Sequence, residues 1–131
     1  MTKLYKQIEN TKQRTQKMKH KMTLNEAPFL KIKNGIKTIE LRLYDEKRRG
    51  IQKGDVIEFK NAVSAEEAML CEVVEMHVFD SFDSLYKNLP LLKCGYTEAD
   101  IDTADPTDMD EYYSRKKQTE YGVVGIELKL L

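Results

Sequence analysis

The stretch Asn34-Gly35-Ile36-Lys37-Thr38-Ile39-Glu40-Leu41-Arg42 decides how this chain is interpreted. Its first two residues are typical of a helix end, because glycine tolerates the left-handed backbone needed just past the last turn. From Lys37 to Leu43 polar and apolar residues alternate, which is the period of a strand with one buried face. The side chains expected on the polar face are Thr38, Glu40 and Arg42. The stretch therefore predicts a helix, a glycine turn and a strand with charged residues gathered on one side.

The polar face of this strand is a candidate for chemistry. Glu40 can accept a proton or hydrogen bonds, and Arg42 can hold a carboxylate, a phosphate or a base edge through its planar guanidinium. Lys37, at the strand entrance, can reach the same cleft as a point charge or a nucleophile. Thr38 lies beside them as a further ligand contact. The alternative is a solvated strand face with a surface ion pair, which contributes about 0–1 kcal/mol.

The segments around this stretch predict several strands with few helices between them. The expected strands are 21–24, 37–43, 56–60, 69–79 and 122–130. The expected helices are one after Asn25, one from Ser81 to Tyr86, and two acidic helices at 97–102 and 107–117. The last strand is apolar on both faces in its first half, as a buried strand would be. This order predicts an α+β fold around a small β-barrel or curled sheet, with short peripheral helices.

Length and composition limit the class of protein. A chain of 131 residues is one ordinary domain, and 40% hydrophobic with 34% charged residues indicates a globular protein with a charged surface. No apolar run reaches the roughly 18 residues that span a bilayer, and the N-terminus has no apolar secretory segment. Cys71 and Cys94 are too few for a disulfide framework, and Cys71 lies in an apolar run that predicts a buried thiol. We therefore expect a cytoplasmic protein without a membrane partner.

Charge is balanced overall but unevenly distributed. The formal net charge is zero. Residues 1–21 are basic, and residues 97–113 carry acidic side chains without a basic one. We expect residues 1–21 to form a basic N-terminal extension, helical over 2–19, and residues 22–131 to form the domain.

Tyrosines mark a second candidate region. Tyr112, Tyr113 and, further on, Tyr121 offer ring faces for stacking bases and hydroxyls for hydrogen bonds. Seating a helix on the barrel is the alternative role for such residues. The acidic residues around them would repel a phosphate backbone, so a nucleoside or short ligand suits this region better than a long polyanion.

Other catalytic and cofactor patterns are missing from the sequence. His20 and His77 are isolated and lack metal-ligand spacing, and His77 is expected to be a half-buried structural residue of a strand. The scattered glycines form no phosphate-binding loop, and no Ser-His-Asp or Cys-His set can be argued. The sequence thus predicts neither a metal nor a cofactor. The charged loop 44–53 is either a rim for nucleic acid or a solvated loop.

Three segments, in order, resemble the ASCH family, whose members are related to PUA domains. Gly35 to Arg42 resembles the family's G-x-K-x-x-E-x-R signature. Lys53-Gly54-Asp55 and the strand after it resemble the next segment typical of the family, and Tyr121 to Glu127 resembles the last strand. The resemblance runs from about residue 22 to 131 and suggests a bacterial single-domain member. It implies a PUA-like β-barrel with a cleft beside the signature strand.

The resemblance also implies functions. Family members are thought to bind RNA or nucleotides in that cleft, so an RNA- or nucleotide-binding module is the first hypothesis. Some small members are amidohydrolases that deacetylate N4-acetylcytidine with a lysine, a threonine three residues later and a glutamate further along. Here Lys37 matches the lysine and Glu40 stands at the threonine position. In this alternative Lys37 is the nucleophile or base and Glu40 moves the proton. A protein-interaction module is a third hypothesis.

Overall fold

The computed structural model describes residues 16–131. The helix predicted over residues 2–19 therefore lies outside the described residues except at its end, and there the prediction is wrong. Lys19 already belongs to strand β1 (Lys19–Leu24), which begins two residues before its predicted start. Lys19 and His20 pair in parallel with Val56 and Ile57 of the neighbouring strand, and this pairing extends the sheet into the segment assigned to the extension.

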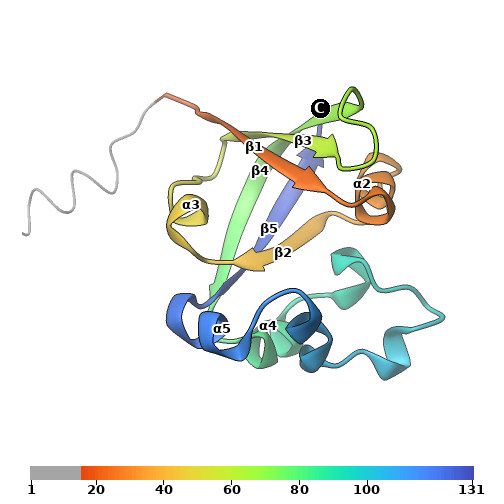
Figure 1. Cartoon of the computed structure of the whole chain (residues 1–131), viewed down its shortest axis with the longest axis vertical. Helices are drawn as coiled ribbons and strands as arrows, with labels where there is room; N and C mark the ends of the chain where they lie inside the picture. The colour runs from red at the N-terminus through yellow and green to blue at the C-terminus, as the bar shows by residue number, and fades with distance from the viewer. Residues whose placement is uncertain (1–15) are drawn as a thin grey trace, which may run out of the picture.

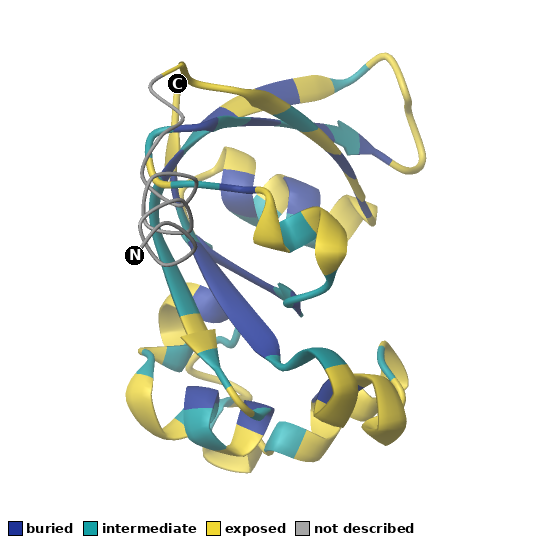
Figure 2. Ribbon diagram, turned by 90° about the vertical axis from the view of Figure 1, so that its left-hand side faces the viewer, coloured by how far each residue is buried: buried dark blue, intermediate teal, exposed yellow. Residues whose placement is uncertain are grey.

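Five strands form one curled sheet. The strands after β1 are β2 (Ile39–Leu43), β3 (Val56–Asn61), β4 (Ala68–Phe79) and β5 (Val123–Leu130). Their order is β1-β3-β4-β5-β2, with β1 parallel to β3 and all other neighbours antiparallel. β4 is long enough to serve both halves of the sheet, and its register shifts between Val73 and Glu75. Figures 1 and 2 show the sheet bending into a half-barrel, which confirms the predicted α+β fold.

Short helices surround this sheet. The α-helices are α2 (Glu26–Lys33), α3 (Glu46–Arg49), α4 (Phe82–Asn88) and α5 (Arg115–Tyr121). Three 3₁₀ segments are η1 (Leu91–Cys94), η2 (Ile101–Thr103) and η3 (Pro106–Glu111). α4, α5 and the 3₁₀ segments gather below β2 in Figure 1, whereas α2 lies near β1 and β3. Among the helices of residues 16–131, none has the length and apolar character needed to cross a bilayer.

β5 separates two hydrophobic clusters. Val124, Ile126 and Leu128 join the cluster between the sheet and α2, whereas Val123 joins the cluster between β2 and α4. Both faces of this strand are therefore buried over its first half, as the sequence predicts. Cys71 is fully buried in the first cluster, and this burial raises the pKa of its thiol to about 11.

The acidic segment after η1 does not form the two helices predicted at 97–102 and 107–117. It forms η2, η3 and the later helix α5 instead. The reason is local competition for backbone donors: Asp100 accepts from the backbone N–H of Thr97, and Asp105 accepts from that of Thr107. Such short-range bonds favour turns over continuous helix. Ser114 then caps α5 by accepting from Lys117 N–H.

Candidate functional site

Three charged side chains of the signature stretch form a buried cluster, called here the ion triad (Lys37, Glu40 and Arg42). Lys37 Nζ lies 2.8 Å from Glu40 Oε1, and Arg42 Nε donates to Glu40 Oε2 at 2.7 Å. Glu40 is only 4% exposed. Burial raises the pKa of Glu40, but the charges and hydrogen bonds of Lys37 and Arg42 outweigh that effect, so the pKa is lowered overall. The carboxylate is thus held ionised between two cations.

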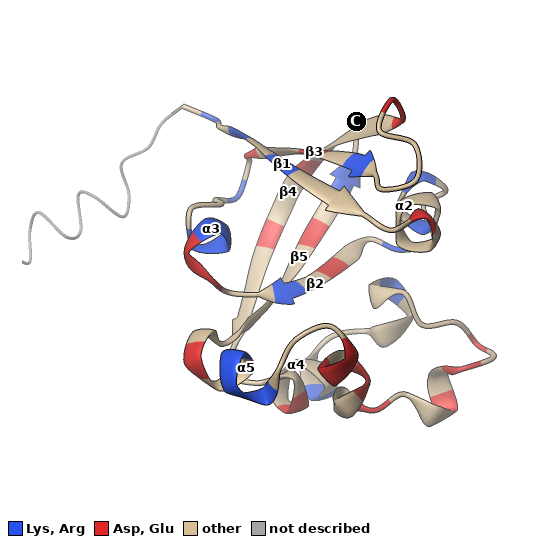
Figure 3. Ribbon diagram, in the orientation of Figure 1, with Lys and Arg blue, Asp and Glu red and all other residues tan. Residues whose placement is uncertain are grey.

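The alternation of β2 explains how this cluster forms. One face of the strand is hydrophobic, and its side chains pack into the hydrophobic cluster against α4: Ile39, Leu41 and Leu43. Because side chains alternate along a strand, Glu40 and Arg42 lie on the other face. Figure 3 shows the two opposite charges side by side along β2. Arg42 Nη2 also donates to the carbonyl of Thr23 at 3.2 Å, so this arginine links β2 to the end of β1.

Gly95 supports the lysine of the triad. Its φ of +114° is a conformation that side chains disfavour, and a Cβ there would lie 3.4 Å from Lys37 Cδ. The carbonyl of Gly95 accepts a hydrogen bond from Lys31 Nζ at 2.8 Å. The turn after η1 therefore packs directly against the Lys37 stem and joins it to α2.

The triad lines a cavity of about 750 Å³, called here the β2 cavity. Its walls come from the end of β1, α2, β2, α4, the end of η1 with the turn after it, and η3. A volume of this size lies within the roughly 300–1,000 Å³ typical of small-molecule sites. The charged residues that line it besides the triad are Lys31, Asp100, Asp108 and Glu111.

Four tyrosines also line the β2 cavity: Tyr86, Tyr96, Tyr112 and Tyr113. The ring of Tyr113 stacks on Phe82 with centroids 6.3 Å apart, and burial raises the pKa of its hydroxyl. Tyr112 is 62% exposed, so its ring stands at the mouth. The two tyrosines expected from the sequence at 112 and 113 are thus brought to the ion triad.

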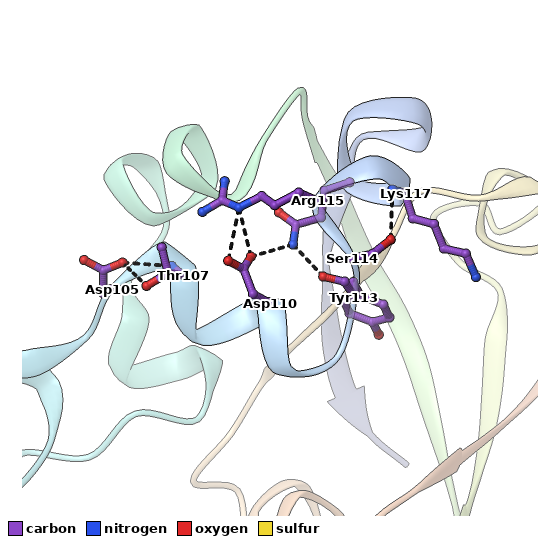
Figure 4. A network of polar contacts seen from close by, with 8 residues as sticks. Asp105, Thr107, Asp110, Tyr113, Ser114, Arg115 and Lys117 are labelled. Atoms are coloured by element: carbon purple, nitrogen blue, oxygen red, sulfur yellow. Dashed lines mark hydrogen bonds and ion pairs between the residues drawn. The ribbon is translucent and has the colours of Figure 1, made fainter.

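A polar network fixes the corner that carries Tyr112 and Tyr113 (Figure 4). The buried Gln118 donates through Nε2 both to Asp110 Oδ1 at 2.9 Å and to the carbonyl of Tyr113 at 2.8 Å. Arg115 Nε donates to the same carboxylate at 3.1 Å. The start of α5 therefore holds the end of η3, which sets the position of this part of the cavity wall.

Tyr86, Tyr96 and Asp108 form a second polar group of the wall, called here the tyrosine relay. The Tyr86 and Tyr96 hydroxyls lie 2.7 Å apart, and Tyr96 donates to Asp108 Oδ2 at 2.7 Å. Burial is the largest cause that raises the pKa of both hydroxyls. Sequence reasoning missed these residues and Lys31, because no pattern within α4, η1 or η3 shows that they meet across the cavity.

Two of the expected site residues lie elsewhere. Thr38 makes backbone bonds to Lys93 and Leu128 and is not part of the β2 cavity lining. Tyr121, at the end of α5, lines a second hollow of about 500 Å³ with Tyr44 and Arg49. Thr38 and Tyr121 are therefore not among the residues that line the β2 cavity, and their expected ligand-binding role stays a prediction.

The basic loop faces that second hollow rather than the β2 cavity. Arg49 lies over the Tyr44 ring at 4.4 Å and donates to the Tyr121 carbonyl at 2.9 Å. Arg48 pairs with Asp45, the residue that caps α3. His77, on β4, is half-buried and lies 2.8 Å from Glu127, which agrees with the structural role expected for it.

Comparison with known proteins gives the family. The model of the ASCH domain family matches residues 22–131. The chain belongs to the ASCH domain family. A search of curated proteins finds no match. The ASCH assignment agrees with the signature that places Lys37, Glu40 and Arg42 around one carboxylate.

Two solved structures of ASCH-like proteins are similar to this chain. The crystal structure of the hypothetical protein PH0355 is 31% identical, with a TM-score of 0.72, covering 87% of this chain and 100% of that one. The solution structure of protein PF0455 from Pyrococcus furiosus is 32% identical, with a TM-score of 0.67, covering 87% and 98%. The PUA-like fold implied by the signature is thereby confirmed.

Proposed function

We propose that the β2 cavity binds a nucleotide, either free or as one unit of an RNA strand. The ion triad is the observation that carries this proposal, because its two cations and one carboxylate line the cavity and the triad itself keeps one net positive charge. A buried cluster of this kind is costly to assemble for stability alone. A ligand that accepts hydrogen bonds accounts for it.

The triad keeps donors for such a ligand. Among the described residues, Lys37 uses one of its N–H groups on Glu40, and Arg42 uses one on Glu40 and one on Thr23. A lysine has three donors and an arginine five. The remaining N–H groups suit a phosphate or a base carbonyl, and Glu40 holds both side chains in place for it.

The rest of the cavity suits a base rather than a long polyanion. Tyr112 and Tyr113 offer ring faces, and stacking on such rings contributes about 1–3 kcal/mol per base. Asp100, Asp108 and Glu111 line the same cavity, and Figure 3 shows acidic segments along the loops beside it. These carboxylates repel additional phosphates. A ligand with one or two phosphates at the triad therefore fits best.

Titration calorimetry with nucleoside 5′-monophosphates tests the proposal. Arg42→Gln should weaken binding by at least about tenfold, because a charge-assisted hydrogen bond is lost. Arg49→Gln is the matched control, since Arg49 belongs to the second hollow, and its affinity should equal that of the wild type. Absence of nucleotide binding, or equal loss in both variants, would reject the β2 cavity as the site.

Salt dependence distinguishes a free nucleotide from an RNA strand. The logarithm of the affinity falls with the logarithm of salt concentration in proportion to the number of phosphates neutralised. A short single-stranded RNA with only one phosphate neutralised at the triad predicts a shallow slope of about −0.7. A markedly steeper slope for RNA would indicate further phosphate contacts outside the cavity.

The contact between Lys37 and Glu40 supports a second candidate, hydrolysis of an acylated cytidine. A lysine 2.8 Å from a carboxylate inside a cavity is an arrangement that can activate a nucleophile. The lowered pKa of Glu40 makes it a weak base near neutral pH, which places binding first. Turnover of N4-acetylcytidine that disappears in Lys37→Met would support the hydrolase, and absence of turnover would reject it.

A further inference from the structure

The tyrosine relay gives the β2 cavity a directional hydrogen-bonding group. Tyr86 comes from α4, Tyr96 follows η1 and Asp108 lies in η3, and all three line the cavity. The relay has two links, each 2.7 Å between oxygen atoms. Each of these short oxygen–oxygen contacts requires a hydrogen atom between the two oxygens. Among the three side chains, only the two phenol hydroxyls carry such a hydrogen atom.

The position of each hydrogen atom follows from the chemistry of the ends. An ionised carboxylate only accepts, so the single hydrogen of Tyr96 must point to Asp108. The oxygen of Tyr96 then accepts in the other link, and the hydrogen of Tyr86 must fill it. Tyr86 therefore has no hydrogen left to donate. Toward the cavity, its oxygen is an acceptor.

We infer that Tyr86 selects a nucleotide whose base presents an exocyclic amino group, as cytosine and adenine do. The inference rests on the proposed nucleotide site. An amino group donates to the Tyr86 oxygen. In uracil or hypoxanthine a carbonyl oxygen stands at the same position, and it and the Tyr86 oxygen are both acceptors, so no hydrogen bond forms between them. An unsatisfied acceptor pair is penalised on binding, and such penalties are the usual source of discrimination between analogues.

The two polar groups of the cavity are complementary in this respect. Lys37 and Arg42 supply donors on β2, and the relay supplies an acceptor on the wall made by α4, η1 and η3. A nucleotide with acceptors on its phosphate and a donor on its base satisfies both. Ribose hydroxyls donate and accept equally well, so they cannot provide this selectivity.

Two matched pairs of ligands test the inference by titration calorimetry with the full chain. Cytidine and uridine 5′-monophosphate differ at the amino position of a pyrimidine, and adenosine and inosine 5′-monophosphate differ at that of a purine. In at least one pair the amino ligand should bind about tenfold more tightly, the ratio expected when one buried acceptor is left unpaired.

Tyr96→Phe keeps the ring and removes the middle of the relay. Tyr86 then regains a rotatable hydroxyl that can donate or accept, so the preference should fall to about one while the amino ligand still binds. Asp108→Asn should do the same, because its amide can donate to Tyr96 and turn the relay around. Tyr44→Phe is the control: Tyr44 lines the second hollow and not the β2 cavity, so the preference should persist.

The outcomes separate the two proposals. A preference in the wild type that Tyr96→Phe and Asp108→Asn abolish supports the relay. Equal binding of both members of each pair, or a preference that survives both variants, overturns the relay and leaves the nucleotide site standing. If no monophosphate binds the wild type, the nucleotide site fails and the relay fails with it.

Discussion

Two buried carboxylates, Asp55 and Glu40, have nearly the same exposure and different surroundings. Asp55 is 2% exposed and Glu40 is 4% exposed. Asp55 accepts from two backbone N–H groups, those of Met18 and Gln52, and lies 2.8 Å from His20 Nε2. Glu40 instead pairs with the side chains of Lys37 and Arg42. Within residues 16–131 the contacts of Asp55 thus include two backbone N–H groups and an imidazole, whereas those of Glu40 are with two cations.

This difference assigns Asp55 to the fold and Glu40 to the proposed binding site. The bonds of Asp55 join the turn before β3 to the segment that leads into β1, at a point where the sheet begins. The bonds of Glu40 leave both cations with further donors at the cavity wall. Burial alone therefore does not mark a functional carboxylate. Under the proposed function, Glu40 is distinguished by its position on the cavity wall between two cations that keep further donors.

The largest expected effect tests the structural half of this comparison. Asp55→Ala should lower the free energy of unfolding by about 3–5 kcal/mol, because buried backbone donors lose their charged acceptor. Urea denaturation measures it. Glu58→Ala, which breaks the surface pair with Lys19, should move the transition very little. A stable Asp55→Ala protein would contradict the assigned role.

The next largest effect tests the role of Glu40 in the proposed binding site. Glu40→Gln should cost about 2–3 kcal/mol, because the two cations lose their countercharge but can reach solvent through the cavity. Inorganic phosphate should restore part of the melting temperature of this variant, since the anion can take the place of the carboxylate. It should restore less in Asp55→Ala, whose intact triad gains from phosphate only what the wild type gains. Equal rescue of both variants would show that phosphate acts without regard to the triad.

The strand that carries the triad is predictable from sequence, for a reason that lies within the strand. The alternation from Thr38 to Leu43 determines which side chains share a face, so the pattern alone places Glu40 and Arg42 together. Lys37 is added by the ASCH signature. Thr38 does not join them, because the strand begins at Ile39 and the residue before it is held by backbone bonds to Lys93 and Leu128.

The relay could not be predicted, because its members are brought together only by the packing of loops. Tyr86, Tyr96 and Asp108 come from three different segments, and the acidic stretch was expected as helix. Tyr113 is a candidate by residue type, yet its place depends on Gln118, whose buried amide holds the Tyr113 carbonyl. Tyr121 has the same residue type and faces the second hollow, because α5 ends there.

A smaller effect is expected at the glycines that accompany the two acids. Gly54, before Asp55, has φ +92°, and Gly95, against Lys37, has φ +114°. Alanine at either position should cost about 1–2 kcal/mol in backbone strain. Only Gly95→Ala should also weaken nucleotide binding, because relief of the backbone strain would move the turn that packs against the Lys37 stem.

Gly50→Ala is the control for both glycines. The φ of Gly50 is −80°, and among residues 16–131 the atom nearest to a Cβ there is the Lys47 carbonyl oxygen, at an ordinary 3.6 Å. This substitution should leave stability unchanged or slightly increase it, by restricting the unfolded chain. Denaturation curves of the three variants, followed by calorimetry, distinguish strain from damage to the site. Loss of nucleotide binding in Gly54→Ala would contradict the assignment of Asp55 to the fold and of Glu40 to the site.

The last expected effect is the pH dependence that Glu40 adds to stability. Its pKa is lowered in the folded protein, since the attraction of Lys37 and Arg42 exceeds the effect of burial. The folded state thus favours the ionised form more than the unfolded state does, whose glutamates titrate near about 4.3. The contribution is complete above that pH and is lost as the pH falls through the lowered folded pKa. Wild type and Glu40→Gln should therefore differ in free energy of unfolding by a constant amount from about pH 7 to 5.5, and the difference should shrink as the pH falls below about 4.3. Urea denaturation across this range measures the difference, and the other carboxylates cancel because both proteins carry them. A difference that grew on acidification would mean that the pKa of Glu40 is raised, and the triad would then hold a protonated acid instead of an ion pair.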